Sequence, residues 1–275
     1  MQLRLPNHRY TMTRLALFVV CCAVALVAPA IGKTFVFQNQ HGSTVWIGTL
    51  GNAGLEAPND GGFALNSGDQ VTVTTADDWA GRFWARTGCN FNGNDGTCET
   101  GDCGNVLACN GAGGVPPVSL AEFTLNGYGD VDYYDVSFVD GYNVGLQVGC
   151  LPARASQGLA SAIQPQTQSV DPNNQYSCGV AGCLNDLNSN CPDDLRQTND
   201  AGDTVACKSA CLAFDTDQYC CRGDYGTSDT CQSSTWPQNY PAYFKDNCPN
   251  AYSYAYDDTT STYTCSDTGY TITVG

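Results

Sequence analysis

Closely spaced cysteines at residues 89–109 restrict the folds open to this chain more than any other feature. Cys89, Cys98, Cys103 and Cys109 alternate with glycine-containing turns, in a chain that carries 17 cysteines. A loop-rich segment of this kind buries little apolar surface and depends on disulfides for its stability. The spacing therefore predicts a stapled, loop-rich domain of an extracellular protein.

Residues 1–32 have the order of regions found in a secretory signal peptide. Three arginines precede an apolar run at residues 15–27, and Ala28-Pro-Ala30 supplies small residues for cleavage. The run is short for a spanning helix, and no later segment is apolar over a comparable length, so we expect no stable membrane insertion. The segment predicts a secreted protein.

Loss of the signal peptide would leave a strongly acidic chain. The full sequence has 11 basic and 27 acidic residues, and the signal contains three of the basic and none of the acidic ones. Eight basic residues would then face 27 acidic ones, a net charge of −19. Nucleic acid is excluded as a partner because its recognition needs a basic surface. A neutral polysaccharide remains compatible with this charge.

The remaining cysteines and the near absence of histidine argue against metal and cofactor chemistry. Fifteen cysteines follow residue 32, and in an oxidising compartment they are expected to form disulfides, with one left over. His41 is the one histidine beyond the signal, so a zinc site with several histidine ligands is excluded. We expect no metal and no cofactor.

Short segments of alternating apolar and polar residues predict a mainly β fold, an antiparallel β-sandwich. The clearest are residues 34–39, 44–49, 70–75 and 81–86, with glycine-rich turns between them. A closing strand at 269–274 is expected to return to the first sheet. The sandwich domain is accordingly assigned to residues 33–147 and 266–275.

The rest of the chain divides by composition into two parts. Residues 148–177 are rich in Gln, Ser and Ala, without an apolar period, and predict an insertion or linker. Residues 178–265 are dense in cysteine and predict a disulfide-rich second domain of loops and short helices. One helix-like run is expected near residues 206–215.

Motifs along almost the whole mature chain resemble the thaumatin-like family, pathogenesis-related group 5, which includes osmotin-like proteins. The longest are Trp84-Ala-Arg-Thr-Gly-Cys89, Cys98-Glu-Thr-Gly-Asp-Cys103-Gly104, Tyr134-Asp-Val-Ser-Phe-Val-Asp-Gly-Tyr-Asn143 and Cys248-Pro-Asn-Ala-Tyr-Ser-Tyr-Ala-Tyr-Asp-Asp258. The resemblance implies a β-sandwich with a disulfide-rich second region and an acidic cleft between them. It also implies seven disulfides: Cys89–Cys98, Cys103–Cys109, Cys178–Cys265, Cys183–Cys248, Cys191–Cys207, Cys211–Cys220 and Cys221–Cys231.

The chain departs from the family pattern at one bridge and one cysteine. The family usually joins a cysteine in the first strand-loop to one near the C-terminus, but here His41 occupies the first place and the chain ends at Gly275 without a cysteine. Strand pairing must then hold the terminus. Cys150, inside the expected insertion, is the cysteine left over. It is expected to be either an unreacted thiol on a mobile loop or the link of a disulfide-bonded dimer.

The family resemblance also assigns the candidate site, a cleft lined by an arginine and four acids. The matching positions are Arg82, Glu122, Asp135, Asp140 and Asp257. Two alternatives stay open, since Arg86 lies on the same strand face as Arg82 and Asp258 adjoins Asp257. Tyr128, Tyr133, Tyr142 and Tyr256 lie near these acids in the sequence and are candidates for stacking on sugar rings.

Paired carboxylates suit a polysaccharide ligand, because they accept hydrogen bonds from hydroxyls and can act as acid and base in glycoside hydrolysis. We expect Glu122 to be the catalytic acid and Asp140 the base or stabiliser. The leading hypothesis is a secreted defence protein that binds fungal-wall β-1,3-glucan, or a related polysaccharide, with weak endo-β-1,3-glucanase activity. The alternative is a non-enzymatic antifungal or stress protein that acts on membranes or a cell-surface receptor.

Overall fold

The structure is a computed structural model that describes residues 2, 32–151, 173–266 and 269–275. The described residues from Gly32 onward belong to one compact unit. The expected signal peptide, residues 1–32, lies outside the described residues except at positions 2 and 32. In the part that is described, no helix has both the length and the apolar character needed to span a membrane.

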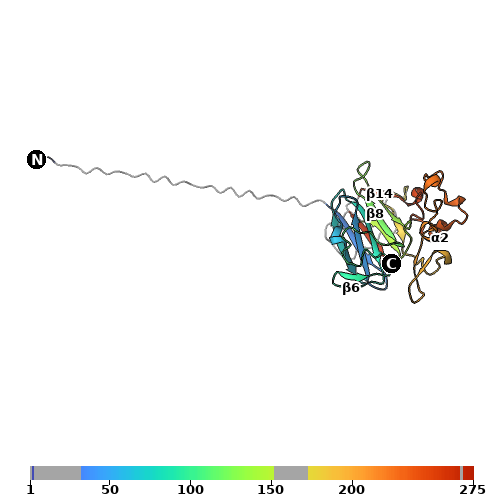
Figure 1. Ribbon diagram of the computed structural model, residues 1–275. Coiled ribbons are helices and arrows are strands. Elements are labelled where there is room, and N and C mark those ends of the chain that lie inside the picture. The colour runs from blue at the N-terminus through green and yellow to red at the C-terminus, as the bar shows by residue number, and fades with distance from the viewer. Residues whose placement is uncertain (1, 3–31, 152–172, 267–268) are drawn as a thin grey trace. The chain divides into compact units, whose positions relative to one another are not determined.

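Two β-sheets form the core of this unit (Figure 1). The six-stranded sheet has the order β14 (Tyr263–Cys265), β9 (Asp132–Ser137), β8 (Leu120–Thr124), β5 (Ala80–Arg86), β2 (Val45–Gly51) and β3 (Gly62–Leu65). The five-stranded sheet has the order β11 (Ala181–Cys183), β10 (Leu146–Cys150), β15 (Gly269–Val274), β1 (Lys33–Asn39) and β4 (Gln70–Thr75). All pairs are antiparallel except β1 with β15. The predicted mainly β, antiparallel architecture is confirmed.

Shorter elements complete the described fold. Two small hairpins pair β6 (Asn90–Asn92) with β7 (Asp95–Thr97) and β12 (Arg196–Thr198) with β13 (Thr204–Cys207). The helices are α1 (Ala210–Phe214), α2 (Tyr240–Asn247) and α3 (Asp258–Ser261), with single 3₁₀ turns at Pro58–Gly61, Asp193–Leu195, Gly223–Tyr225 and Ser233–Thr235. The predicted helix near residues 206–215 is therefore a strand end followed by the short helix α1.

Aromatic side chains from the two sheets meet in the core. The ring of Phe35 on β1 lies 4.9 Å from that of Phe123 on β8, and Phe37 lies 5.2 Å from Phe83 on β5. Each fully buried ring of this size contributes about 1.5–3 kcal/mol through the hydrophobic effect. Because side chains alternate along a strand, burial of Phe83 and Ala85 leaves Arg82 on the outer face of the six-stranded sheet.

The C-terminal strand β15 lies between β10 and β1, and all six of its residues are buried. Its Tyr270 hydroxyl donates to Oδ2 of Asp132 at 2.6 Å, and the same oxygen is 2.8 Å from Nζ of Lys33. Strand pairing and this buried polar contact thus hold β15 in the five-stranded sheet.

Seven disulfides are present among the described residues, and they are the seven pairs that the family resemblance implies. They are Cys89–Cys98, Cys103–Cys109, Cys178–Cys265, Cys183–Cys248, Cys191–Cys207, Cys211–Cys220 and Cys221–Cys231. The bond between Cys183 and Cys248 joins β11 to the residue after α2, so the loop-rich region is covalently attached to the five-stranded sheet.

The position predicted for Cys150 is wrong. Both alternatives assumed an exposed loop, but Cys150 is the last residue of β10 and is only 1% exposed. Its Sγ lies 2.7 Å from Sγ of Cys265 in the core. A second chain could reach this sulfur only if the sandwich opened, so a disulfide-linked dimer through Cys150 is incompatible with the folded chain.

The boundary drawn at residue 148 also differs from the structure. Residues 148–150 belong to β10 rather than to an insertion, because Val148 pairs with Ile272 of β15. Residues 152–172 of the expected insertion lie outside the described residues. Strands β11 and β14 belong to the two large sheets, although the sequence placed both in the region 178–265. The sequence missed them because each is only three residues long.

Candidate functional site

A row of charged side chains crosses the outer face of the six-stranded sheet. Arg82 on β5 lies opposite Glu122 on β8, and Glu122 lies opposite Asp135 on β9. Directly opposed residues on adjacent antiparallel strands have Cβ atoms about 4.5–5.5 Å apart. The sheet register therefore brings a guanidinium and two carboxyl groups together from three separate parts of the sequence.

This row forms one side of a hollow of about 730 Å³, open solvent included. Among the described residues its lining consists of Arg82, Leu120, Glu122, Asp135, Ser137, Val139, Asp140, Tyr252, Ala255 and Asp258. Four of these are acids, and one is a cation. We call this space the acidic hollow.

Asp140 reaches the acidic hollow through a tight turn after β9. The N–H of Gly141 donates to the carbonyl of Phe138 at 2.9 Å, and Gly141 has a φ of 83°, a conformation that favours glycine. The carbonyl of Asp140 accepts a hydrogen bond from the N–H of Val118 at 2.8 Å. The turn overrides the strand alternation that would otherwise aim Asp135 and Asp140 to opposite faces.

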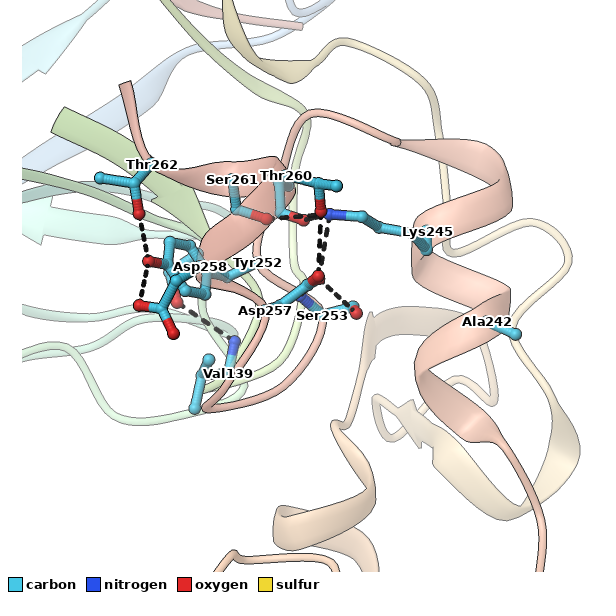
Figure 2. Close-up of polar contacts among 12 residues, drawn as sticks. Val139, Ala242, Lys245, Tyr252, Ser253, Asp257, Asp258, Thr260, Ser261 and Thr262 are labelled. Atoms are coloured by element: carbon cyan, nitrogen blue, oxygen red, sulfur yellow. Dashed lines mark hydrogen bonds and ion pairs between the residues drawn. The ribbon is translucent and has the colours of Figure 1, made fainter. Parts of the chain in front are cut away.

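The assignment of Asp257 to the cleft is corrected to Asp258. The carboxylate of Asp257 forms an ion pair with Nζ of Lys245 at 2.9 Å and accepts hydrogen bonds from the N–H and hydroxyl of Ser253 (Figure 2). These contacts turn it toward α2 and leave the lining of the acidic hollow to Asp258. The Tyr252 hydroxyl donates to Oδ1 of Asp258 at 2.8 Å.

Arg86, the alternative cation, belongs to the scaffold. Its side chain is completely buried, and its guanidinium donates to the carbonyls of Trp46, Ile47, Val106 and Leu107 at 2.7–3.2 Å. Burial lowers its pKa to about 10, although Asp102 acts in the opposite direction. Arg86 therefore ties the 98–109 loops to β2, and Arg82 is the arginine that lines the acidic hollow.

A second, more apolar hollow of about 310 Å³, open solvent included, adjoins the first, since Val139 and Ala255 line both. Its wall includes Trp236, which packs edge-on against Tyr219 and Tyr254 with centroids 5.0 and 5.6 Å apart. We call it the aromatic hollow. None of these rings was among the four tyrosines predicted to stack on sugars, and among those four Tyr142 is buried in the core.

A sequence model of the Thaumatin family matches residues 39–275. The chain belongs to the thaumatin family. Pathogenesis-related thaumatin-like protein 3.5 of Cryptomeria japonica is 46% identical over 264 residues, which cover 96% of this chain and 95% of that protein. Pathogenesis-related protein 5 of Arabidopsis thaliana is 50% identical over 240 residues, covering 87% and 88% of the two chains. These matches confirm the resemblance seen in the motifs.

Another relative bears an enzymatic name. The protein named glucan endo-1,3-beta-glucosidase of Prunus avium is 39% identical to this thaumatin-family chain over 254 residues, which cover 90% of this chain and 93% of that protein. That activity is stated of the Prunus protein.

Three acids of this thaumatin-family site hold their protons more strongly than exposed carboxyl groups do. Burial raises the pKa of Asp135 well above its usual range, and Glu122 and Asp258 raise it further. Burial also raises the pKa of Glu122 and of Asp140, against the opposing effect of Arg82 on each. Oδ1 of Asp135 is buried without a hydrogen-bond partner among the described residues. Such an oxygen favours the neutral acid.

The raised pKa of Asp135 has a testable effect on the pH dependence of stability. At pH values between the pKa of Asp135 in the unfolded chain and its raised pKa in the folded chain, the native state binds more protons than the unfolded state. The contribution of Asp135 to the free energy of unfolding is therefore present at low pH and is lost as pH rises through the folded pKa. Asp135→Asn mimics the neutral acid and removes this loss. At neutral pH the free energy of unfolding of the variant should exceed that of the wild type by about 1.4 kcal/mol for each unit by which folding raises the pKa of Asp135.

Urea denaturation of both proteins over a series of pH values measures this gain. Asp200→Asn, at an exposed position, is the matched control, and its difference from the wild type at each pH is the baseline for the Asp135→Asn measurement. A pH-independent difference for Asp135→Asn would mean that Asp135 ionises normally in the folded chain.

Proposed function

We propose that this chain is a secreted defence protein that binds β-1,3-glucan of fungal walls in the acidic hollow. The observation that carries the proposal is the cross-strand row of Arg82, Glu122 and Asp135, with Asp140 and Asp258 in the same lining. Seven disulfides within the described part of the chain are typical of an oxidising, extracellular compartment and support secretion.

The polar groups of the acidic hollow complement a neutral sugar chain. Carboxylate oxygens accept hydrogen bonds from ring hydroxyls, while the guanidinium of Arg82 donates to hydroxyl and ring oxygens. The buried Oδ1 of Asp135, which has no partner among the described residues, would gain one in a complex. The glucanase name of the Prunus relative supports β-1,3-glucan as the polysaccharide.

Slow hydrolysis of the bound glucan is a second candidate, favoured by the raised pKa values in the acidic hollow. Glu122 and Asp135 face each other, and like charges at this separation favour one shared proton. We therefore assign the general acid to the Glu122–Asp135 pair rather than to Glu122 alone. Asp140 would act as the base or nucleophile on the opposite side of the scissile bond.

Recovery of the protein on insoluble β-1,3-glucan tests the proposal, and two adjacent aspartates provide a matched pair of variants. Asp258→Asn should weaken glucan binding about tenfold, because a charged acceptor in the lining becomes neutral. Asp257→Asn should leave glucan binding unchanged but lower the free energy of unfolding by about 1–3 kcal/mol, since the half-buried Lys245 loses its counter-charge.

The contrast between the two variants separates site from scaffold. If the wild type is not recovered on the glucan, the proposed function is rejected, and leakage of liposomes at low salt would favour the membrane-active alternative. If the wild type binds but only Asp257→Asn weakens the recovery, the correction from Asp257 to Asp258 is wrong.

The aromatic hollow extends the proposed site to a neighbouring sugar. A pyranose presents an apolar face that packs on aromatic rings, and the shared residues Val139 and Ala255 place Trp236 next to the acidic hollow. The Trp236 Nε1 is buried without a partner among the described residues, whereas Trp79 and Trp84 donate to carbonyls. The emission of Trp236 should therefore respond most to a bound ligand.

Titration with soluble β-1,3-gluco-oligosaccharides should change the tryptophan fluorescence of the wild type, and Trp236→Phe should remove this change. Trp46→Phe, which removes a tryptophan that packs on Phe91 instead, is the control and should retain it. A Trp236→Phe variant with an undiminished response would show that the sugar chain does not extend into the aromatic hollow.

A further inference from the structure

Three sulfur atoms lie together at the end of strand β10. Within the described ranges, Cys150, Cys178 and Cys265 are the one group of three or more His, Cys, Asp or Glu side chains whose ligand atoms all lie within 4.8 Å of one another. Cys178 and Cys265 form a disulfide, and the thiol of Cys150 contacts Sγ of Cys265 at 2.7 Å. No atom fits between the two sulfurs at 2.7 Å, so the Cys150 thiol and the Cys178–Cys265 disulfide are positioned to react.

We propose that Cys150 exchanges with the Cys178–Cys265 disulfide, so that the three sulfurs form a thiol–disulfide exchange site. The Cys150 thiol loses its proton when an opening of the core admits water, and the thiolate attacks Sγ of Cys265. The Cys150–Cys265 bond forms as the Cys178–Cys265 bond breaks, and Sγ of Cys178 leaves as a thiolate that takes a proton from water. One thiol and one disulfide are present before and after, so no oxidant or reductant is consumed.

The second disulfide isomer fits the architecture of the sandwich. Cys150 ends β10 of the five-stranded sheet, and Cys265 ends β14 of the six-stranded sheet, so their bond would join the two sheets directly. The paired residues are 87 positions apart in one isomer and 115 in the other. The entropy that a disulfide removes from the unfolded chain varies only with the logarithm of this separation. The two isomers therefore differ little in this contribution to stability.

Exchange changes which sulfur can meet solvent. Cys150 is almost completely buried, while Cys178 is only partly buried and lies just after the 152–172 segment in sequence. The thiol produced at Cys178 would be the one open to a small disulfide or an alkylating reagent. The exchange thus moves the thiol from Cys150 in the core to Cys178 at the edge of the core.

Alkylation of the native protein with iodoacetamide at mildly alkaline pH, followed by an acid quench and disulfide mapping by mass spectrometry, tests the exchange. The wild type should carry the label on Cys178 together with a Cys150–Cys265 linked peptide. Cys150→Ser is the control and should keep the Cys178–Cys265 bond with no label on either residue. A label on Cys150 beside an intact Cys178–Cys265 bond, or no label at any of the three, would overturn the proposal.

A second variant reports on the alternative bond without alkylation. Cys178→Ser, produced in an oxidising compartment, should contain a Cys150–Cys265 disulfide when mapped without reduction. If it instead contains two thiols at these positions, the proposal is wrong. Should this variant fail to fold, the result for the wild type and Cys150→Ser decides alone. Both experiments are independent of the proposed glucan binding.

Discussion

Arg86→Met is expected to lower the free energy of unfolding by about 3–5 kcal/mol, because each buried carbonyl left without its hydrogen-bond donor costs about 1–3 kcal/mol. The guanidinium donates to four backbone carbonyls and lies 5.3 Å from the centroid of Phe91. Methionine fills a similar volume but donates no hydrogen bond. The carbonyl oxygens of Val106 and Leu107, which lie 2.8 and 2.7 Å from the guanidinium nitrogens, would lose their hydrogen-bond donor in a half-buried loop.

Guanidinium chloride denaturation with the disulfides intact measures this loss. Arg82→Met, two residues earlier on the same strand, removes the same charge from a half-buried position and should cost about 1 kcal/mol or less. Equal losses for the two variants would contradict the scaffold role of Arg86. Arg82→Met should in turn weaken glucan recovery, because Arg82 lines the acidic hollow.

The double variant Glu122→Gln with Asp140→Asn is expected to abolish the release of reducing sugar from β-1,3-glucan. General acid–base catalysis by a positioned side chain contributes about 10²–10⁴-fold to a rate, and this variant removes the Glu122 member of the acid pair together with the base Asp140. Gln and Asn keep the size and much of the hydrogen-bonding capacity of the acids. Recovery on insoluble glucan should therefore be weakened, as for Asp258→Asn, but not abolished, although hydrolysis is lost.

A variant with the same change of charge separates catalysis from net charge. Glu56→Gln with Asp200→Asn neutralises two exposed acids outside the acidic hollow and should leave hydrolysis at the wild-type rate. If the Glu122–Asp140 double variant hydrolyses glucan as fast as this control, these acids have no catalytic role. If the wild type does not hydrolyse glucan either, the chain binds the polysaccharide without cleaving it.

Local sequence patterns predicted the sandwich because strand alternation is a local property. The apolar residues Phe35 and Phe37 occupy one face of β1, and both are buried in the core. The same alternation separated Phe83 from Arg82 on β5, which correctly left Arg82 for the outer face. The family motifs added the seven cysteine pairs, which spacing along the chain could not have chosen.

The choice between Asp257 and Asp258 lay beyond any local pattern. The two residues lie at the start of α3, and each carries the same carboxyl group. Lys245, on α2, attracts Asp257, while Tyr252 binds Asp258 beside the acidic hollow. The contacts that separate the two acids involve other segments of the chain and exist only after folding.

Cys150 shows how a compositional boundary can mislead. The Gln- and Ser-rich residues that follow it suggested a loop, but Val148 to Cys150 pair with β15, whose own position depends on β1 at the start of the domain. The aromatic hollow was missed for a similar reason, since Tyr219, Trp236 and Tyr254 show no common period in the sequence.

Motif order along the chain was enough to identify the family and to predict the antiparallel sandwich and the acid types of the site. Folding decided which acid enters the acidic hollow, which arginine supports the loops and which sulfur Cys150 contacts. These outcomes depend on the direction in which a side chain leaves its strand or turn and on the neighbours that pack against it. Those neighbours, such as Lys245 for Asp257 and Cys265 for Cys150, are brought together only by the tertiary structure.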